Sequence, residues 1–179
     1  MPHATLQQLA AGLDLVREAP ADAGTLELIV RRPAPGEREV LATAQLDERA
    51  GLVGDRWAAG GKRPPNLEHQ ITMMSTRFAK LVAGPDPEGW AIAGDQLYVD
   101  LDISRANLPP GTRIAVGDAI LEVTAAPHTG CGKFIRRFGV DSMKLISSDT
   151  GRELRLRGVN TRVVVPGAIS RGDTVRRLG

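Results

Sequence analysis

The chain has 179 residues, of which 42% are hydrophobic and 25% are charged, so it is long enough and apolar enough to fold around one sizeable core. Its 23 lysines and arginines against 21 aspartates and glutamates leave a formal net charge of +2, too small an excess to indicate a nucleic-acid-binding protein. The single cysteine excludes an intramolecular disulfide, a Cys-rich zinc site and a Cys-X-X-Cys redox pair.

The first predicted element is an amphipathic helix over residues 5–16, where apolar side chains recur every three or four positions. A break rich in Pro, Ala and Gly follows at residues 19–24. We expect residues 1–24 to form a helical extension, peripheral to a domain that covers residues 25–179. The other elements of that domain are mostly predicted strands, at residues 25–31, 39–46, 71–74, 97–103, 113–116, 119–125, 161–165 and 174–177.

Two short helices and two loops interrupt these strands. A helix is predicted over residues 75–82 with Ser75 as its cap, and another over residues 131–137, ended by Gly139. Residues 56–65 and 107–111 are predicted loops. Many short strands with regular turns and few helices favour an antiparallel sandwich or barrel, and the fold class we expect is mostly β, a compact antiparallel β-barrel with a few short peripheral helices.

Four Gly-Asp pairs mark predicted strand boundaries, at residues 54–55, 94–95, 117–118 and 172–173. Glycine allows unusual backbone angles and aspartate can bond to the local backbone, so these pairs are typical of turns.

Cys131 has an unusual setting for a lone cysteine. It is flanked by Gly130 and Gly132, and His128 lies three residues before it, while three cations follow within six residues, namely Lys133, Arg136 and Arg137. Nearby positive charge lowers the pKa of a thiol and favours the thiolate, which attacks electrophiles and binds metals. A bystander cysteine is the alternative interpretation.

His128 allows two interpretations. It could form a nucleophilic pair with Cys131, although the partners of such pairs are usually distant in sequence, or it could support the loop or face a cofactor.

Taken together, several blocks resemble the MOSC family, which is named after the C-terminal domain of molybdenum cofactor sulfurase. The resemblance covers roughly residues 25–178 and depends on the order of the blocks more than on any one of them. The blocks are Gly-Leu-Val-Gly-Asp-Arg at 51–56, Gln-Ile-Thr at 70–72, Gly-Asp at 94–95, Gly-Asp-Ala-Ile-Leu-Glu-Val at 117–123, Cys131, Gly-Val-Asn-Thr-Arg-Val at 158–163, Gly167 and Gly-Asp at 172–173.

The chain departs from the family pattern at two places. Gly130 stands where a proline commonly precedes the cysteine, and Val99 and Asp100 stand where the central strand often carries Glu-Asn before its leucine, here Leu101. The second departure puts in doubt any role of those two polar residues in other members.

The resemblance implies a β-barrel that handles the molybdenum cofactor, of the molybdopterin type, or a sulfur atom. In relatives the cysteine is a metal ligand or a persulfide carrier, so Cys131 is the candidate catalytic residue and metal ligand. The best-known relatives are fused to a pyridoxal-phosphate domain, for which this chain has no room. Stand-alone bacterial relatives resemble reductases of N-hydroxylated compounds that draw electrons from partner proteins.

A pterin cofactor carries a phosphate or a dinucleotide tail, so its site needs cations and free backbone N–H groups. Arg56, Lys62, Arg63 and Arg162 are the candidate cations. We expect residues 54–56 and 160–162 to meet residues 128–133 at one barrel mouth. The candidate cofactor-binding residues are Asp55, Arg56, His128, Thr129, Gly130, Lys133, Asn160 and Arg162.

Three functions stay open. The first is a molybdenum-cofactor-dependent oxidoreductase or its cofactor-binding component, which acts on a small molecule with external electron donors. The second is a sulfur carrier that uses a Cys131 persulfide supplied by a donor protein, and the third is a binding module without catalysis. No apolar run is long enough to span a bilayer and the first thirty residues do not resemble a signal peptide, so a cytoplasmic protein with no membrane partner is expected.

Overall fold

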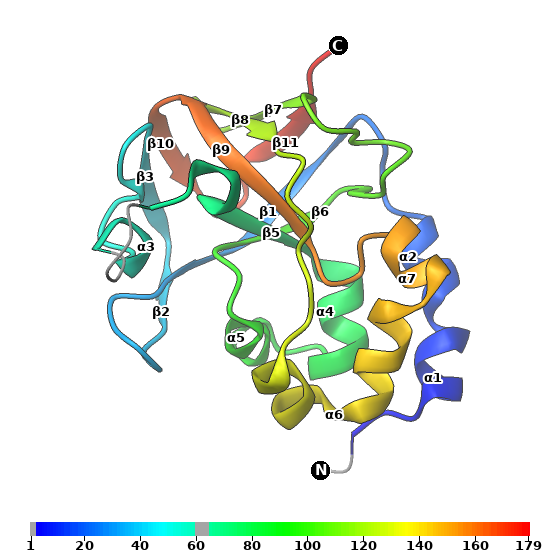
Figure 1. The fold of residues 1–179 in the computed structure, drawn as a ribbon. Helices are drawn as coiled ribbons and strands as arrows, with labels where there is room; N and C mark the ends of the chain where they lie inside the picture. Colours follow the sequence, from blue (N-terminus) through cyan, green and yellow to red (C-terminus); the bar gives the residue numbers. More distant parts are fainter. Residues whose placement is uncertain (1–2, 60–64) are drawn as a thin grey trace.

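The computed structural model describes residues 3–59 and 65–179, and its centre is a closed β-barrel (Figure 1). The barrel closes because residues Ala23, Gly24 and Thr25 of its first strand pair with its last strand. Closure leaves no unpaired strand edge within the barrel. Around the barrel the order is β11 (Thr174–Arg177), β7 (Arg113–Val116), β8 (Ala119–Val123), β9 (Val159–Val165), β5 (Ile71–Ser75), β6 (Leu97–Asp100) and β1 (Ala23–Arg31).

The predicted mostly-β barrel is confirmed, but the prediction of a purely antiparallel barrel needs one correction. Strands β5 and β6 run parallel, with Met73 opposite Leu97 and Ser75 opposite Val99. Parallel neighbours need a long crossover connection, usually helical. Here the crossover contains α4 (Thr76–Ala83), α5 (Pro87–Trp90) and the short helix η2 (Ala91–Ala93).

Four further short strands extend the barrel. β2 (Glu39–Leu41) pairs with β1, and a separate antiparallel sheet has the order β10 (Gly167–Ser170), β3 (Thr43–Asp47) and β4 (Gly51–Leu52). Leu46, Leu52 and Ile169 of this sheet belong to the same hydrophobic cluster as the barrel interior. The small sheet therefore completes the barrel core.

Several strands are buried on both faces, so the molecule has two cores. In β6, Leu97 and Val99 point into the barrel, whereas Tyr98 packs in a second cluster outside it. In β1 an irregularity between Leu26 and Leu28 shifts the alternation, so that both Leu28 and Val30 join the outer cluster. The second core lies between the barrel wall and a helical layer.

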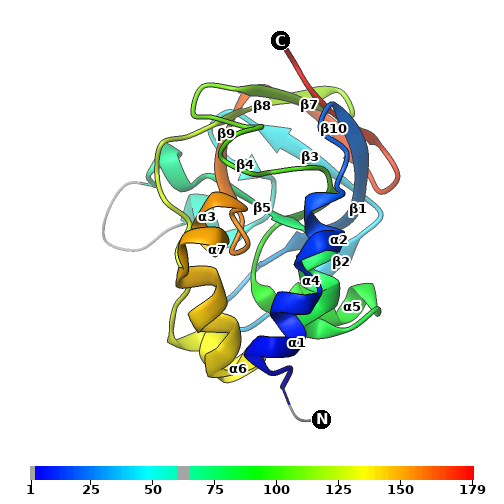
Figure 2. The ribbon, with the colours of Figure 1, turned by 90° about the vertical axis from the view of Figure 1, so that its right-hand side faces the viewer.

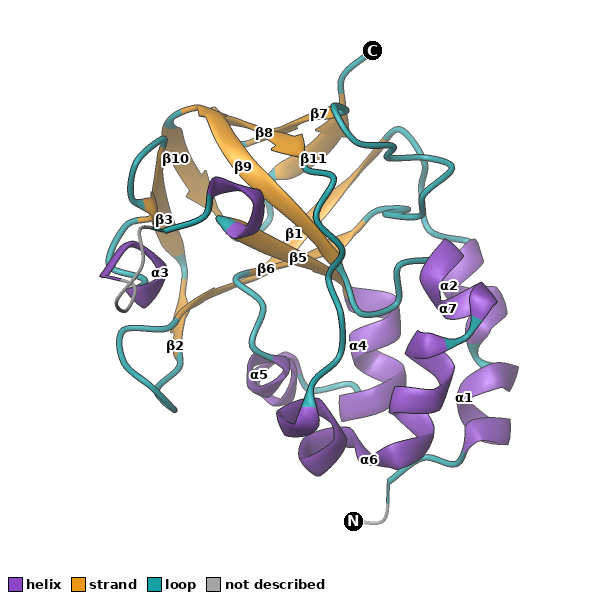
Figure 3. Ribbon diagram, in the orientation of Figure 1, coloured by secondary structure: helices purple, strands orange, loops and turns teal. Residues whose placement is uncertain are grey.

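The helices of that layer gather on one side of the molecule (Figures 2 and 3). Leu9, Leu13 and Val16 of the two N-terminal helices are buried in the outer cluster, which also contains Phe78 and Phe138. The N-terminal segment thus packs on the helical layer and not in the barrel interior. The helices not yet named are α1 (Leu6–Ala11), α2 (Leu13–Arg17), α3 (Arg56–Ala59), η1 (Leu67–His69), α6 (Gly132–Ser147) and α7 (Asp149–Glu153).

The predicted helices are present at the expected positions, but their details differ. The first helix is divided at Gly12 into α1 and α2. Ser75 occupies the N-cap position of α4, but its hydroxyl makes no capping bond. Gly139 has a non-helical backbone (φ 85°, ψ 166°) and ends the first helical part of α6 as predicted, while a second helical part follows it and continues to Ser147. No helix in the described part of the chain is long and apolar enough to cross a membrane.

Candidate functional site

Cys131 lies at the N-terminus of α6, in the N-cap position with an extended backbone (φ −137°, ψ 172°), and it is exposed. Partial burial raises the pKa of its thiol, but the nearby backbone N–H groups of Phe134 and Lys133 lower it. The charges of Arg157 and Lys133 act in the same direction, and the net pKa is below the ordinary value for cysteine. The thiolate, which is the reactive and metal-binding form, is therefore favoured.

The cysteine loop, defined as residues 124–131 between β8 and α6, is fixed by the buried carboxylate of Asp95. The Oδ1 atom of Asp95 lies 2.7 Å from His128 Nε2, and its Oδ2 atom accepts a hydrogen bond of 2.6 Å from Arg157 Nη1. Because a carboxylate only accepts, a neutral His128 must carry its proton on Nε2. Arg157 also lies over the ring of Phe134, with 5.2 Å from the guanidinium carbon to the ring centroid. Asp95 thus connects the barrel mouth, the loop and the first turn of α6.

Burial and neighbouring charge act in opposite directions on this network. Burial raises the pKa of the Asp95 carboxyl, but Arg157 and His128 outweigh it and lower that pKa well below its ordinary range. For His128, burial is the largest influence and lowers the imidazole pKa, and Asp95 opposes it. Arg157 and His69 add to the lowering. Burial, helped by Arg157, outweighs the attraction of Asp95, so the net pKa of His128 is lowered and its ring is neutral at pH 7.

The contact with Asp95 corresponds to the loop-supporting interpretation of His128. In the part of the chain that the structure describes, no hydrogen bond joins His128 to Cys131. The sequence does not identify Asp95 and Arg157 as candidates, because the Gly94-Asp95 pair is typical of a turn and stands in a motif block.

Asn160 holds the start of the cysteine loop from β9. Its Nδ2 atom donates a hydrogen bond of 3.1 Å to the carbonyl of Ala126, and its own carbonyl accepts one of 3.0 Å from the Thr124 N–H. Its Oδ1 atom is buried and has no partner among the described residues. Thr129 and Gly130, further along the loop, line a cavity.

Asp55 accepts hydrogen bonds from other residues of the chain. It is buried, and both of its oxygens accept hydrogen bonds from the Arg32 guanidinium, at 2.9 Å from Nε and 2.8 Å from Nη2. The Trp57 N–H also donates to it at 2.9 Å, which caps the first turn of α3. Burial raises the pKa of the Asp55 carboxyl, but these bonds, led by those from Arg32, lower it overall. Asp55 therefore orients Arg32.

Three guanidinium groups converge on Gly94. Arg32 Nη1 donates a hydrogen bond of 3.0 Å to the Gly94 carbonyl. A Cβ atom built at Gly94 would lie 3.5 Å from Arg38 Nη2 and 3.8 Å from Arg137 Nη1. Arg56, the first residue of α3, acts electrostatically on Arg38 as well. We call these four residues, Arg32, Arg38, Arg56 and Arg137, the arginine cluster.

Arg38 is the least compensated member of the cluster. Its Nη1 donates to the carbonyl of Glu37 at 2.5 Å, but its Nε is buried without a partner among the described residues. Burial lowers the pKa of its guanidinium, and Arg137, Arg32 and Arg56 lower it further. Excess positive charge of this kind attracts an anion.

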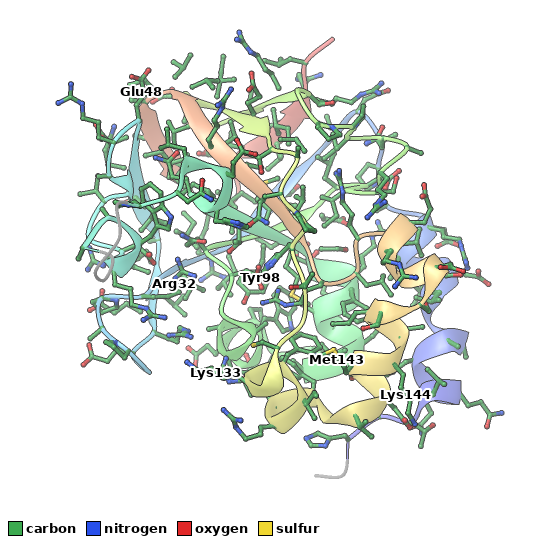
Figure 4. The ribbon with its side chains drawn as sticks, viewed as in Figure 1. Arg32, Glu48, Tyr98, Lys133, Met143 and Lys144 are labelled. Carbon is green, nitrogen blue, oxygen red and sulfur yellow. The ribbon has the colours of Figure 1, made fainter. Side chains whose placement is uncertain are left out.

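The cluster connects two motif blocks that the sequence singled out. Arg56 follows the Gly-Asp turn at 54–55, and Arg137 lies on α6, six residues after Cys131. Lys133, in the first turn of α6, and Arg32 both lie on the left-hand side of Figure 4.

Arg162 is not placed with these residues. It is directly opposite Glu122 in the β8–β9 pairing and forms an ion pair of 2.6 Å with it. It lines a shallow hollow with Glu48 and Arg49, none of which lines the cavity beside the cysteine loop. The expectation that Arg162 shares a pocket with Cys131 is therefore not supported. Lys62 and Arg63, two other candidate cations, lie outside the described residues.

A metal centre built from several protein ligands is not present among the described residues, since no three His, Cys, Asp or Glu side chains come together. Cys131 is the candidate soft ligand, because a thiolate binds thiophilic metals.

Comparison with known proteins supports the fold. No protein-family model matches the sequence, and no curated protein matches it. A crystal structure of a hypothetical protein matches with a TM-score of 0.61 at 20% identity, over 92% of this chain and 71% of the other. YuaD from Bacillus subtilis matches with a TM-score of 0.58 at 21% identity, over 86% of this chain and 94% of the other. YiiM from Escherichia coli matches with a TM-score of 0.57 at 19% identity, over 87% of this chain and 70% of the other.

YuaD and YiiM are of the MOSC-domain type, so these neighbours support a MOSC-like fold for this chain. At such low identity the likeness concerns the fold alone.

Proposed function

We propose that this protein binds a molybdenum cofactor of the molybdopterin type, with Cys131 as the ligand of the metal and the arginine cluster as the site of the anionic tail. The observation that carries this proposal is the combination of a thiol with a lowered pKa and, across the Asp95 network, a cluster of arginines with too few acidic partners.

The residues present fit such a group in three respects. A soft, deprotonated thiolate suits a thiophilic metal. Arginine suits a phosphate, because its planar fork can form two parallel hydrogen bonds. Gly94, whose φ of 98° favours glycine, places backbone without a side chain next to the Arg38 and Arg137 guanidinium groups.

When bound, a molybdenum cofactor supplies two-electron redox chemistry, which is the basis for proposing an oxidoreductase component that acts on a small N-hydroxylated or similar compound. The residues of the chain itself act by positioning the groups of the site. Asp95 fixes His128 and Arg157 and so holds the cysteine loop, Asp55 orients Arg32, and Lys133 favours the thiolate of Cys131. Electrons would come from a partner protein.

The exposure of Cys131 favours one second candidate, a sulfur carrier. In that function the Cys131 thiolate attacks the outer sulfur of a donor persulfide. The sulfur–sulfur bond of the donor breaks, a new one forms on Cys131, and the donor leaves as a thiolate. No net oxidation occurs.

Metal analysis distinguishes the two candidates. Protein purified from cells able to make the cofactor should carry molybdenum, and Cys131→Ser, which replaces a soft anion by a hard neutral group, should lose it. Arg38→Gln should weaken cofactor retention roughly 10- to 100-fold, the scale of one charged hydrogen bond. Arg176→Gln is the matched control, because Arg176 is exposed on β11 and the charge change is the same.

Undiminished molybdenum in Cys131→Ser would refute the ligand assignment. Wild-type protein without molybdenum, but with cyanide-releasable sulfur that disappears in Cys131→Ser, would establish the sulfur carrier instead.

A further inference from the structure

A second cationic site lies beside the cysteine loop, apart from the arginine cluster. It is a cavity of about 340 Å³ that lies between the loop and α7. In Figure 1 the loop descends in front of β9, with α3 and α5 to its left and α7 to its right. Four arginines line this cavity, and none of the described residues that line it is acidic; the arginines are Arg105, Arg152, Arg155 and Arg157.

Arg155 is held in a backbone conformation that glycine normally adopts. Its φ is 48°, and it directly follows the C-cap of α7. The Leu156 N–H bonds to the Gly151 carbonyl at 2.9 Å and the Arg155 N–H to the Arg152 carbonyl at 3.3 Å, the pattern of a Schellman motif. Glycine is the usual residue there, because a side chain makes the left-handed backbone conformation unfavourable. The presence of arginine at this position therefore indicates that its side chain has a role.

The guanidinium group of Arg155 is held by the described residues through only one of its three nitrogen atoms. Its Nη1 donates to the carbonyl of Leu108 at 2.6 Å and to that of Ile103 at 3.4 Å. Its Nε and Nη2 atoms make no hydrogen bond with the described residues, and both atoms are accessible to solvent. Arg155 thus has two free donors beside the cavity.

The charges around the cavity do not balance. Arg152 pairs with Asp149 at 2.7 Å and Arg157 with Asp95 at 2.6 Å, whereas Arg105 and Arg155 form no ion pair with the described residues. Burial and the charge of Arg105 lower the pKa of the Arg155 guanidinium, and Glu153 only partly opposes them.

The rest of the wall is largely apolar, with Pro110, Ile146 and Val159 as its larger members. A volume of this size is at the lower end for small-molecule sites, which combine apolar walls with a few polar groups. We propose that this cavity binds a small organic anion, a phosphate monoester with an apolar body, whose phosphate meets Arg105 and Arg155. This anion site uses Arg105 and Arg155 and not the arginine cluster, but it shares the cysteine loop and Arg157 with the surroundings of the proposed cofactor site.

Amide chemical shifts in a ¹H–¹⁵N NMR titration test the proposal on the cofactor-free protein. Phenyl phosphate is the probe, and benzyl alcohol and inorganic phosphate separate the contributions of the apolar body and the anion. We expect saturable shifts for phenyl phosphate at residues 124–130 and 151–159, weaker ones for inorganic phosphate and none for benzyl alcohol.

Arg105→Ala is the main variant, because Arg105 is exposed and its side chain makes no hydrogen bond with the described residues. It should weaken phenyl phosphate binding roughly tenfold, the scale of one charged hydrogen bond. Arg155→Lys keeps the charge but loses the fork and should also weaken binding. Arg176→Ala, which removes an exposed charge elsewhere, should leave binding unchanged.

Two results would overturn the proposal: no saturable shift at residues 124–130, or equal weakening by Arg105→Ala and Arg176→Ala, which would indicate a general charge effect. Saturable shifts confined to Gly94, Arg38 and Arg137 would also overturn it, but would leave the proposed cofactor site standing.

Discussion

The stability of the protein should fall as the pH decreases through the ordinary titration range of histidine, because His128 is buried in its neutral form. The folded-state pKa of His128 is lowered, mainly by burial, with help from Arg157 and His69 against Asp95. The unfolded chain therefore binds more protons than the folded chain between the folded pKa and about 6.5. In that window the free energy of unfolding rises with pH, and the contribution of His128 is lost as the pH falls.

The size of this effect corresponds to the uptake of one proton by His128 in the unfolded chain. Lowering the pH from 7.5 to 5.5 costs at most about 1.4 kcal/mol, which is the upper bound for a single histidine of unfolded pKa 6.5. Other groups titrate too, so the relevant quantity is the difference between wild type and His128→Gln, whose amide can still donate to Asp95.

Urea unfolding of both proteins at several pH values between 5.5 and 7.5 measures this difference. Wild type should lose stability relative to His128→Gln as the pH falls. A difference that stays flat would mean that folding does not lower the pKa of His128, and a change in favour of wild type would mean that Asp95 stabilises the protonated imidazole; either result would refute the reasoning from burial.

Three further predictions address other parts of the molecule. In cofactor-free protein, the rate of iodoacetamide labelling of Cys131 should rise with a midpoint below the ordinary thiol value of about 8.5; a midpoint at or above that value would contradict an activated thiolate. Arg38→Gln should raise the free energy of unfolding of the cofactor-free protein by about 0.5 kcal/mol in urea, because it relieves repulsion between arginines. A loss of stability would show that favourable contacts of the Arg38 side chain outweigh the repulsion. Deletion of residues 1–20 should lower the free energy of unfolding by roughly 3–6 kcal/mol, since it removes the buried Leu9 and Leu13, and an unchanged urea midpoint would show that the outer core does not need them.

The sequence predicted local features of the fold well, because they depend on neighbouring residues. The hairpin of β7 and β8 around Gly117 and Asp118 is present, and the glycines of all four Gly-Asp pairs have positive φ. The parallel pairing of β5 and β6 was missed. It depends on which strands become neighbours in space, although a predicted helix directly after a predicted strand was a usable signal of a crossover.

The candidate site was predicted in part, for a similar reason. The cations after Cys131 and the glycines around it are visible in one stretch of sequence. The partners that fix the loop are not, since Asp95 lies 33 residues before His128 and 62 before Arg157. Arg162 was misplaced because its direct cross-strand partner, Glu122, could be identified only from the register of β8 and β9.

The two proposed sites share one physical device. In each site, hydrogen-bond acceptors of the protein hold one guanidinium group, and some of its N–H groups make no hydrogen bond with the described residues. Asp55 and the Gly94 carbonyl hold Arg32, and the Leu108 carbonyl holds Arg155. An arginine fixed in this way loses less conformational freedom when an anion binds, so more of each hydrogen bond contributes to affinity. The cost is repulsion between cations in the absence of an anion, which selection for stability alone would remove. Arg155, which is held by backbone carbonyls and forms no ion pair with the described residues, is therefore better explained by anion binding than by folding.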